Sequence, residues 1–193
     1  MAGYQTDIVV IDDCCKDDTI GAAKRWLDEH PIPLKVHLLR NPVNQGYGGN
    51  QKVGYTYAIT HGYDVVVMLH GDGQYPPEKI PDMIAPILNG EADSVFGSRM
   101  INKKEALAGG MPYYKFVGNI VLTTLQNWML GSKISEFHTG FRSYSTKALS
   151  QVPFRYNSDV FHFDTDIIIQ LVDNGMRIKE IPIPTHYGDE VCH

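Results

Sequence analysis

The segment that most constrains the fold is residues 65–78, VVVMLHGDGQYPPE. Its apolar, β-branched beginning is typical of a buried strand in an α/β sheet. The run ends abruptly in small and polar residues, and the Pro-Pro-Glu sequence that follows favours the start of a helix. Open α/β sheets bind ligands beyond such strand ends, so we expect the functional site here.

Asp72 and Gln74 place two oxygen ligands at alternate positions in this segment. Their side chains would face the same way if the chain stays extended there. Hard oxygen donors suit Mg²⁺ or Mn²⁺, and these ions in turn suit diphosphates. The alternative is that Asp72-Gly73 is only a turn, because Asp-Gly is a strong turn signal.

Strands and helices alternate along the rest of the chain. Strands are predicted at 7–13, 34–39, 64–69, 92–96, 137–144 and 177–183, and helices at about 17–30, 49–60, 77–88, 112–130, 146–152 and 164–174. This alternation predicts βαβ units and a largely parallel sheet. A chain of 193 residues is long enough for one domain, and we expect a single domain over 1–193.

Composition excludes several classes of function. The net charge of −5 argues against a nucleic-acid binder that neutralises phosphates. Three cysteines, Cys14, Cys15 and Cys192, form neither a disulfide framework nor a metal-binding pattern, which fits a reducing cytosol. We see no signal peptide and no apolar run that could span a bilayer, so a cytoplasmic protein is expected.

The segment 100–111 carries Lys103, Lys104 and a Gly-Gly pair, and it predicts an exposed, mobile loop. The helix at 112–130 is the most apolar of the chain and is interpreted as a core or interface helix. Its aromatic residues Tyr113, Tyr114 and Phe116 are interpreted as core or helix-packing residues rather than as a platform for a sugar.

Polar residues gather at four predicted strand ends or turns: Asp12 and Asp13, Asp72 and Gln74, Arg99, and 139–142 (TGFR). Acids accept hydrogen bonds from ribose hydroxyls or base N–H groups. A metal ion together with arginines neutralises a diphosphate, which then becomes a good leaving group. This set of groups suits the transfer of a sugar from a nucleotide.

Five short motifs occur in a fixed order: DDCCKDDT at 12–19, NQGYGGN at 44–50, HGDGQYPPE at 70–78, GSR at 97–99 and EFHTGFR at 136–142. Together they resemble the motifs of family 2 glycosyltransferases, especially the dolichyl-phosphate mannose synthase and polyprenyl-phosphate glycosyltransferase branch. The similarity extends from about residue 8 to the end of the chain.

The resemblance implies the GT-A fold, a Rossmann-like α/β three-layer sandwich with a mostly parallel central sheet. It also implies metal-dependent, inverting transfer of a hexose from a UDP- or GDP-sugar. The acceptor would be a polyprenyl or dolichyl phosphate or a glycan, in cell-wall or glycan biosynthesis. A lipid acceptor would be met at the membrane surface, for which we expect the 100–111 loop and the helix after it to make contact.

The same resemblance implies roles for individual residues. The nucleotide sugar would be bound by Asp12, Asp13, Asn44, Gly46, Gly48, His70 and Gly71. The Mg²⁺ or Mn²⁺ ion would be held by Asp72, Gln74 and His70, and phosphates would be met by Arg99 and Arg142. A hydroxyl acceptor would need a general base, for which Asp164 and Asp166 are the candidates, with Glu136 as second choice.

The chain departs from the family pattern at three places. His70 replaces the first Asp of D-x-D, and because His is a poor Mg²⁺ ligand, Asp72 would be the principal charged one. Cys14 and Cys15 replace Gly-Ser, so the backbone at Cys14 is expected to differ. The usual first strand, which ends in P-x-Y/F-N-E, is not found at 1–6. We therefore expect a chain truncated at its N-terminus, with a sheet edge open to a second copy, and a second truncation after 187–190 stays open.

Other interpretations remain open. The chain could be a non-catalytic nucleotide-sugar-binding remnant, or a fragment completed by a partner chain. It could also be a nucleotidyltransferase, although the Gly-rich basic loop expected after the first strand of that class is not visible. Arg142 could pair with an acid purely structurally, and His138, His162 and His186 are expected to be ordinary loop or core residues.

Overall fold

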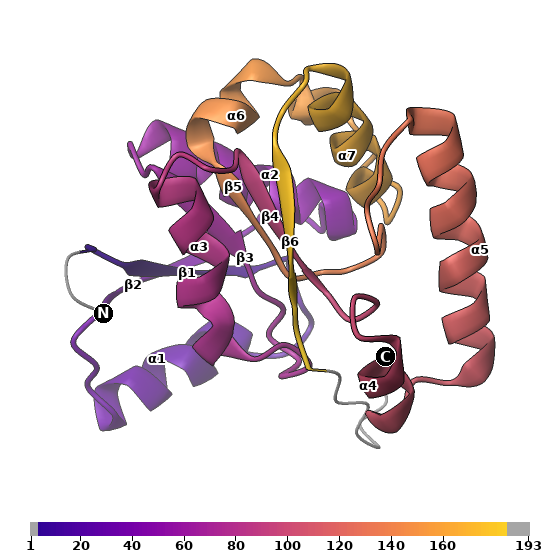
Figure 1. Cartoon of the computed structure of the whole chain (residues 1–193). Helices are drawn as coiled ribbons and strands as arrows, with labels where there is room; N and C mark the ends of the chain where they lie inside the picture. The colour runs from indigo at the N-terminus through magenta and orange to yellow at the C-terminus, as the bar shows by residue number, and fades with distance from the viewer. Residues whose placement is uncertain (1–3, 185–193) are drawn as a thin grey trace.

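The computed structural model describes residues 4–184, so His186, 187–190 and Cys192 lie outside the described residues. The elements follow one another as β1 (Asp7–Asp12), α1 (Thr19–Glu29), β2 (Lys35–Arg40), α2 (Gly46–Thr60), β3 (Val65–Met68), η1 (Pro77–Lys79), α3 (Ile80–Leu88), β4 (Ser94–Ser98), α4 (Lys103–Ala108), α5 (Tyr113–Leu130), β5 (Arg142–Ser145), α6 (Thr146–Gln151), η2 (Phe154–Tyr156), α7 (Phe163–Asp173) and β6 (Ile178–Pro182). Figure 1 shows their arrangement.

The main sheet has the order β3-β5-β4-β6. Strand β5 runs antiparallel to both β3 and β4, and β6 runs parallel to β4, so three of the four strands point the same way. Strands β1 and β2 form a separate parallel pair. The predicted α/β class with mostly parallel strands is confirmed.

Side chains alternate between two cores, one on each face of the main sheet. Val65 and Val67 point toward Met83 of α3, in a cluster on one face. Val66 and Met68 pack on the other face, in a cluster that contains Tyr55 of α2 together with residues of α6 and α7. This period-2 alternation is why the apolar run of β3 packs against a cluster on each face of the sheet. The helix, sheet and helix layers are those of the predicted three-layer sandwich.

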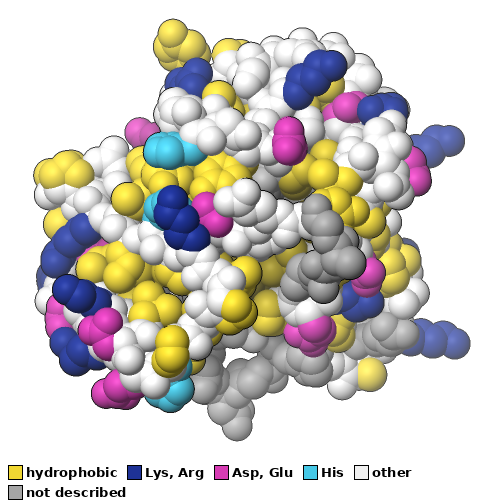
Figure 2. Space-filling view, turned by 90° about the vertical axis from the view of Figure 1, so that its left-hand side faces the viewer, with side chains coloured by type: hydrophobic (Ala, Val, Ile, Leu, Met, Phe, Trp, Pro, Cys, Tyr) yellow, Lys and Arg dark blue, Asp and Glu magenta, His cyan; other side chains and the backbone are white. Residues whose placement is uncertain are grey.

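Strands β1 and β3 each have one ladder partner in the described part of the chain, β2 and β5 respectively. All side chains of β3 are only partly buried, and Ile8 of β1 is 37% exposed. Figure 2, which looks from the side of β1 and β2, shows hydrophobic side chains open to solvent between charged ones. Pairing of such an edge with a second copy stays a prediction.

The glycine-rich segment is part of a helix, although it was predicted as a loop up to residue 49. Helix α2 begins at Gly46, and the amides of Gly48 and Gly49 donate to the Asp159 carbonyl at 2.7 and 3.2 Å. A Cβ at Gly48 would lie 2.4 Å from the Ser158 carbonyl oxygen. Glycine is needed because the backbone around residues 158–160 packs directly on the first turn of the helix.

The segment 100–111 is also more ordered than the predicted exposed loop. It contains α4, and Met100, Ala106 and Met111 form a small buried cluster that packs against Phe116 and Ile120 of α5. Lys103 and Lys104 are exposed, as predicted, but the prediction of a loop was wrong, because apolar residues on both sides of the two lysines anchor a short helix to the helix that follows.

The turn after β1 keeps a backbone of the kind that glycine favours. Cys14 has a φ of 59°, in the left-handed region that L residues with a Cβ rarely adopt. Its thiol lies 3.7 Å from the Pro42 carbonyl oxygen. The cysteine is therefore held in a strained conformation, and a difference from the backbone of the family at this position stays a prediction.

Replacing Cys14 by glycine should relieve this strain. We expect Cys14→Gly to raise the free energy of unfolding by about 1 kcal/mol, the usual cost of left-handed backbone for an L residue. Urea denaturation of the variant measures this change. The matched control is Cys15→Gly at the next, exposed position, which should be neutral or destabilising. An equal gain in both variants would contradict the explanation.

Candidate active site

The residues singled out in the sequence converge on one edge of the main sheet. The segments after β3 and β4 begin at this edge, and β5 starts there because Arg142 pairs in register with both Met68 and Phe96. The N-terminus of α7 reaches the same edge, since the backbone carbonyl of Asp164 accepts a hydrogen bond from Arg142. The antiparallel strand thus brings the TGFR motif next to His70 and Arg99.

Arg142 is the centre of this edge and is completely buried. Its guanidinium donates to three backbone carbonyls, those of Thr139 at 2.8 Å, Phe137 at 2.8 Å and Asp164 at 3.1 Å. It also lies 3.3 Å from a carboxylate oxygen of Asp164. Arg142 thus joins three segments of the chain. A phosphate could bind its guanidinium only by displacing these carbonyl and carboxylate partners.

Asp164 is surrounded by donors as well. Tyr47 donates to one carboxylate oxygen at 2.9 Å, and Gln51 to the other at 3.4 Å. Burial, followed by the charge of Asp164, raises the pKa of Tyr47, so the phenol stays protonated and donates. Asp166, the second base candidate, accepts the Ser158 amide at 3.0 Å. Both acids therefore hold structure in place.

His70 lies at the carboxyl end of β3, between Tyr47 and Asp72. Its Nε2 is 3.5 Å from the Tyr47 hydroxyl, and its Nδ1 is 3.9 Å from an Asp72 oxygen. Burial lowers the pKa of His70, so the ring is neutral at pH 7. The ring packs on Gly140, where a Cβ would come within 2.6 Å of it. The glycine of the TGFR motif is what makes room for His70.

Asp72 lies in a tight turn. Its carboxylate accepts the Gln74 amide at 3.1 Å, and Gly73 has a φ of 72°. The chain does not stay extended here, because the left-handed glycine reverses it, so the condition for Asp72 and Gln74 to face the same way is not met and the alternative of an Asp-Gly turn is confirmed. Asp72 and the adjacent Gly71 remain exposed at the site.

The side chains at this edge suit a metal ion that is shared between protein and substrate, rather than one enclosed by protein ligands alone. Residues 4–184 contain no group of three His, Cys, Asp or Glu side chains placed to hold one. Asp72 and the neutral His70 nevertheless lie within 3.9 Å of each other and offer an oxygen and a nitrogen ligand. Mg²⁺ and similar ions bind in this way, through one or two protein ligands plus phosphates of the substrate. The two residues fit a metal that is completed by a diphosphate, and an imidazole ligand favours Mn²⁺ over Mg²⁺.

Arg99 forms a second buried ion pair, which the sequence did not suggest. Its backbone amide and its Nε donate to Glu136 at 2.8 and 3.0 Å, and its NH2 also contacts Glu136. Asn119 of α5 donates to the same carboxylate at 3.1 Å. Glu136 is fully buried, so this second-choice base is neutralised by Arg99. The side chain of Arg99 is 14% exposed and lies at the boundary of the site.

The two acids after β1 fix the loop that leads into α2. Asp12 is buried and accepts the Cys15 amide at 2.8 Å, which lowers the pKa of Asp12. Asp13 accepts the Gln45 amide at 2.7 Å, and Asn44 donates to the Asp13 carbonyl at 3.1 Å. The predicted nucleoside-binding residues are thus joined to one another, whereas Gly46 and Gly48 pack on residues 158–160.

Several residues of the site escaped the sequence analysis. Tyr47 bridges His70 and Asp164, and its ring lies 4.7 Å from that of Phe161. Tyr75 accepts the Gly140 amide at 2.8 Å. The only available signal was their position inside the motifs at 44–50 and 70–78, where each tyrosine is flanked by motif residues.

Comparison with known proteins identifies the chain. The family model described as glycosyl transferase family 2 matches residues 2–152. The chain belongs to glycosyl transferase family 2. It is 30% identical to a UDP-N-acetylglucosamine–dolichyl-phosphate N-acetylglucosaminyltransferase of Methanococcus voltae, over 95% of this chain and 76% of that protein. It is 28% identical to an undecaprenyl-phosphate mannosyltransferase of Micrococcus luteus, over 93% and 71% of the two chains.

Solved structures agree on the fold of this family 2 chain. Glucosyl-3-phosphoglycerate synthase from Mycobacterium tuberculosis, bound to phosphoglyceric acid, superimposes with a TM-score of 0.64 at 17% identity. The match covers 95% of this chain and 62% of that chain. The same enzyme has been solved with Mn²⁺ and UDP-glucose, at a TM-score of 0.58. The GT-A fold expected from the motifs is therefore confirmed.

Substitution of Gly140 tests the packing of His70. We expect Gly140→Ala to lower the free energy of unfolding by about 1–3 kcal/mol, since the new Cβ collides with His70 and Tyr75. Thermal and urea denaturation measure the change. Gly71→Ala is the matched control, because a Cβ there meets nothing within 4 Å. Equal stability of the two variants would show that the close approach is not a constraint.

Proposed function

We propose that this chain transfers a hexose from a nucleoside-diphosphate sugar to a polyprenyl phosphate, with inversion at the anomeric carbon. Family membership supports the glycosyl transfer, and the named relatives act on dolichyl and undecaprenyl phosphates. The choice of a phosphate acceptor rests on how the three candidate bases are bonded within the protein. These bases are Asp164, Asp166 and Glu136.

Each of these three acids is already engaged with the protein. Asp164 is held by Tyr47, Gln51 and Arg142, Asp166 by the Ser158 amide, and Glu136 by Arg99 and Asn119. A hydroxyl acceptor needs a base within hydrogen-bond reach to take its proton. A phosphate acceptor is an anion at neutral pH and needs none. The arrangement therefore favours a lipid phosphate over a glycan hydroxyl.

The proposed step is a single in-line displacement. A phosphate oxygen of the acceptor forms the new bond to the anomeric carbon while the bond from that carbon to the diphosphate breaks. The electron pair of the broken bond leaves with the nucleoside diphosphate. Asp72 and His70 would hold a divalent cation, which when bound stabilises the charge that develops on the leaving group. Arg99, whose side chain is partly exposed at the boundary of the site, would contribute positive charge near the phosphates.

The remaining residues position the donor in this proposal. Asp12, Asp13 and Asn44 form the nucleoside side of the site, while the Arg142–Asp164 pair keeps Tyr47 and His70 in place. Inversion follows from one displacement because no protein nucleophile takes part. The assay described next identifies the transferred sugar and the nucleobase of its donor.

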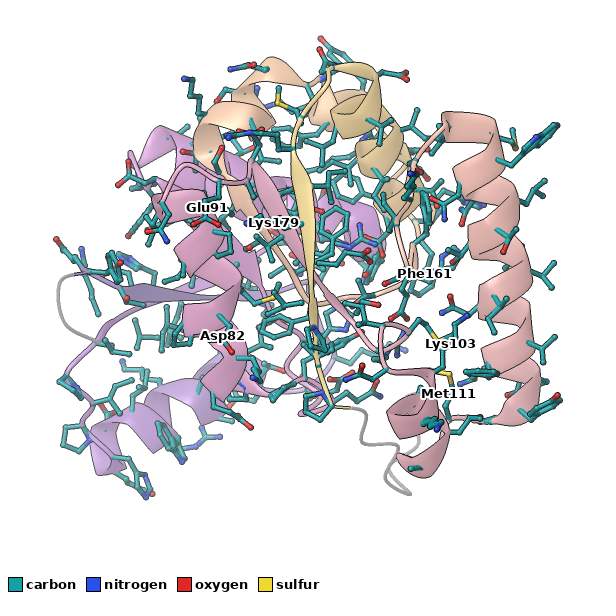
Figure 3. All side chains as sticks on the ribbon, in the orientation of Figure 1. Asp82, Glu91, Lys103, Met111, Phe161 and Lys179 are labelled. Atoms are coloured by element: carbon teal, nitrogen blue, oxygen red, sulfur yellow. The ribbon has the colours of Figure 1, made fainter. Side chains whose placement is uncertain are left out.

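The direct test measures transfer of labelled sugar from UDP-glucose, UDP-N-acetylglucosamine and GDP-mannose to undecaprenyl phosphate with Mn²⁺. We expect one donor to be used and Asp72→Asn to lower kcat/KM at least about 100-fold, since a charged ligand of the metal is lost. Asp82→Asn is the matched control. Asp82 is exposed on α3, on the opposite face of the sheet from α2 and α7, and lies far from Phe161 in Figure 3.

The outcomes separate the proposal from its rivals. Nucleotide binding without transfer, measured by isothermal titration, would indicate a non-catalytic remnant. Release of pyrophosphate from a nucleoside triphosphate would indicate a nucleotidyltransferase. An equal decrease of kcat/KM in Asp72→Asn and Asp82→Asn would overturn the assignment of the metal site.

Replacement of His70 by aspartate, the residue expected there from the D-x-D pattern, should change the preferred metal. We expect His70→Asp to raise the ratio of Mg²⁺-supported to Mn²⁺-supported transfer about tenfold, because Mg²⁺ strongly prefers oxygen ligands. Initial rates at saturating concentrations of each metal measure this ratio. The control variant His70→Asn offers an uncharged oxygen. An unchanged ratio in His70→Asp would mean that His70 does not contact the metal.

A further inference from the structure

Helix α5 turns its apolar side outward. Eight large hydrophobic residues of this helix are exposed: Tyr113, Tyr114, Val117, Val121, Leu122, Leu125, Trp128 and Met129. Trp128 is 80% exposed and Met129 is 70% exposed. Figure 1 shows α5 at the margin of the molecule. Among residues 4–184, no helix has both the length and the hydropathy needed to cross a bilayer. Tyr113 and Tyr114 are exposed, so a core position for them was wrong, whereas Phe116 packs on the 100–111 cluster.

The exposed residues share one face of the helix. They recur at intervals of three and four residues, as in Val117, Val121, Leu125 and Trp128, which places them along one broad stripe. Part of this stripe, with Ile120 and Thr124, is hollowed into a shallow apolar depression. A soluble helix normally shows the reverse arrangement, with its apolar stripe against the core.

The inner face of α5 is polar in its middle, and this polar face holds the helix to the protein. Asn119 donates to Glu136, and Thr123 donates to Asn119 at 3.1 Å. The Asn127 amide donates to the Ile134 carbonyl at 2.7 Å and accepts the Ile134 amide at 2.9 Å. The outward position of the apolar side is therefore fixed by a hydrogen-bond network and is not a consequence of loose packing.

We propose that the outward face of α5 lies in the headgroup region of an anionic membrane, with the helix parallel to the surface. The helix has no acidic residue, although the whole chain carries a net charge of −5. Exposed lysines border the face: Lys103 and Lys104 lie near its first end, as Figure 3 shows for Lys103, and Lys133 follows its last turn. Apolar residues flanked by lysines, with aromatic residues at both ends of the helix, are typical of interfacial helices.

The lysines also decide between a membrane and a second copy of the chain. In a symmetric dimer through α5 the three bordering lysines of each copy would approach those of the other, while α5 carries no acidic residue and α4 carries one, Glu105. Anionic headgroups would neutralise all of these lysines at once. Each lysine near the membrane surface then contributes favourably to the free energy of binding. Charge complementarity therefore favours the lipid surface as the occupant.

The same helix connects the membrane to the site. Asn119, on the inner face, shares the Glu136 carboxylate with Arg99. A helix lying on the membrane would thus hold Arg99 near the level where lipid phosphates lie. This connection to a lipid acceptor rests on the proposed function, whereas membrane docking itself does not.

The test is co-flotation with vesicles of phosphatidylcholine and phosphatidylglycerol (7:3), compared with vesicles of phosphatidylcholine alone. We expect binding to the anionic vesicles, with a partition coefficient at least about tenfold lower for the double variant Leu125→Ser/Trp128→Ser. The control, Trp26→Ser/Tyr156→Ser, removes two exposed aromatic residues from α1 and η2 and should bind like the parent. Thermal melting checks that both variants are folded. In a Trp26→Phe background, the fluorescence of Trp128 should shift to the blue on binding.

Absence of vesicle binding by the parent chain would overturn the inference, as would equal binding by Leu125→Ser/Trp128→Ser. A dimer in light scattering that this variant converts to a monomer would also overturn it, in favour of a second copy. Transfer to a short-chain, water-soluble prenyl phosphate tests the enzyme without a membrane. If the parent chain does not transfer sugar to this soluble acceptor, the proposed function is contradicted. Vesicle binding tests the role of α5 independently of that result.

Discussion

The buried ion pair between Arg142 and Asp164 is the interaction on which the site depends. It joins the start of the antiparallel strand β5 to the first turn of α7, and through Tyr47 it reaches the first turn of α2. Removing one partner of such a pair leaves a buried charge and typically costs about 3–5 kcal/mol. The same pair holds the carbonyls of Phe137 and Thr139, and so positions Gly140 under His70.

This arrangement divides the acids into two groups. The buried ones, Asp164 and Glu136, are neutralised by arginines and keep the walls of the site in place. Asp72 is left exposed in a turn at the end of β3, where it can serve a donor diphosphate and its metal. Such a division suits a reaction in which the acceptor brings its own negative charge. Because buried Glu136 also accepts a hydrogen bond from Asn119, the inner face of α5 is joined to the site while its outer face stays exposed.

The sequence predicted the strands, the layers and the segments of the site well, because strand ends and apolar alternation are local features. It did not predict which charged residues are buried. The burial of Arg142 depends on the register between β5 and β3, and the pairing of Arg99 with Glu136 joins residues far apart in the chain. The periodicity of α5 was recognised but its orientation was not, since the polar partners of Asn119 lie outside the helix.

In the proposed reaction the acceptor is an anion and no carboxylate base takes part. A comparison of undecaprenyl phosphate with the corresponding alcohol, undecaprenol, tests this directly, using the donor and metal that support transfer. Sugar should be transferred to the phosphate, with less than about one hundredth of that rate to the alcohol, because no base is free to deprotonate the alcohol. Comparable rates with the two acceptors would rule out this reaction and would return Asp164, Asp166 and Glu136 as candidates for the base.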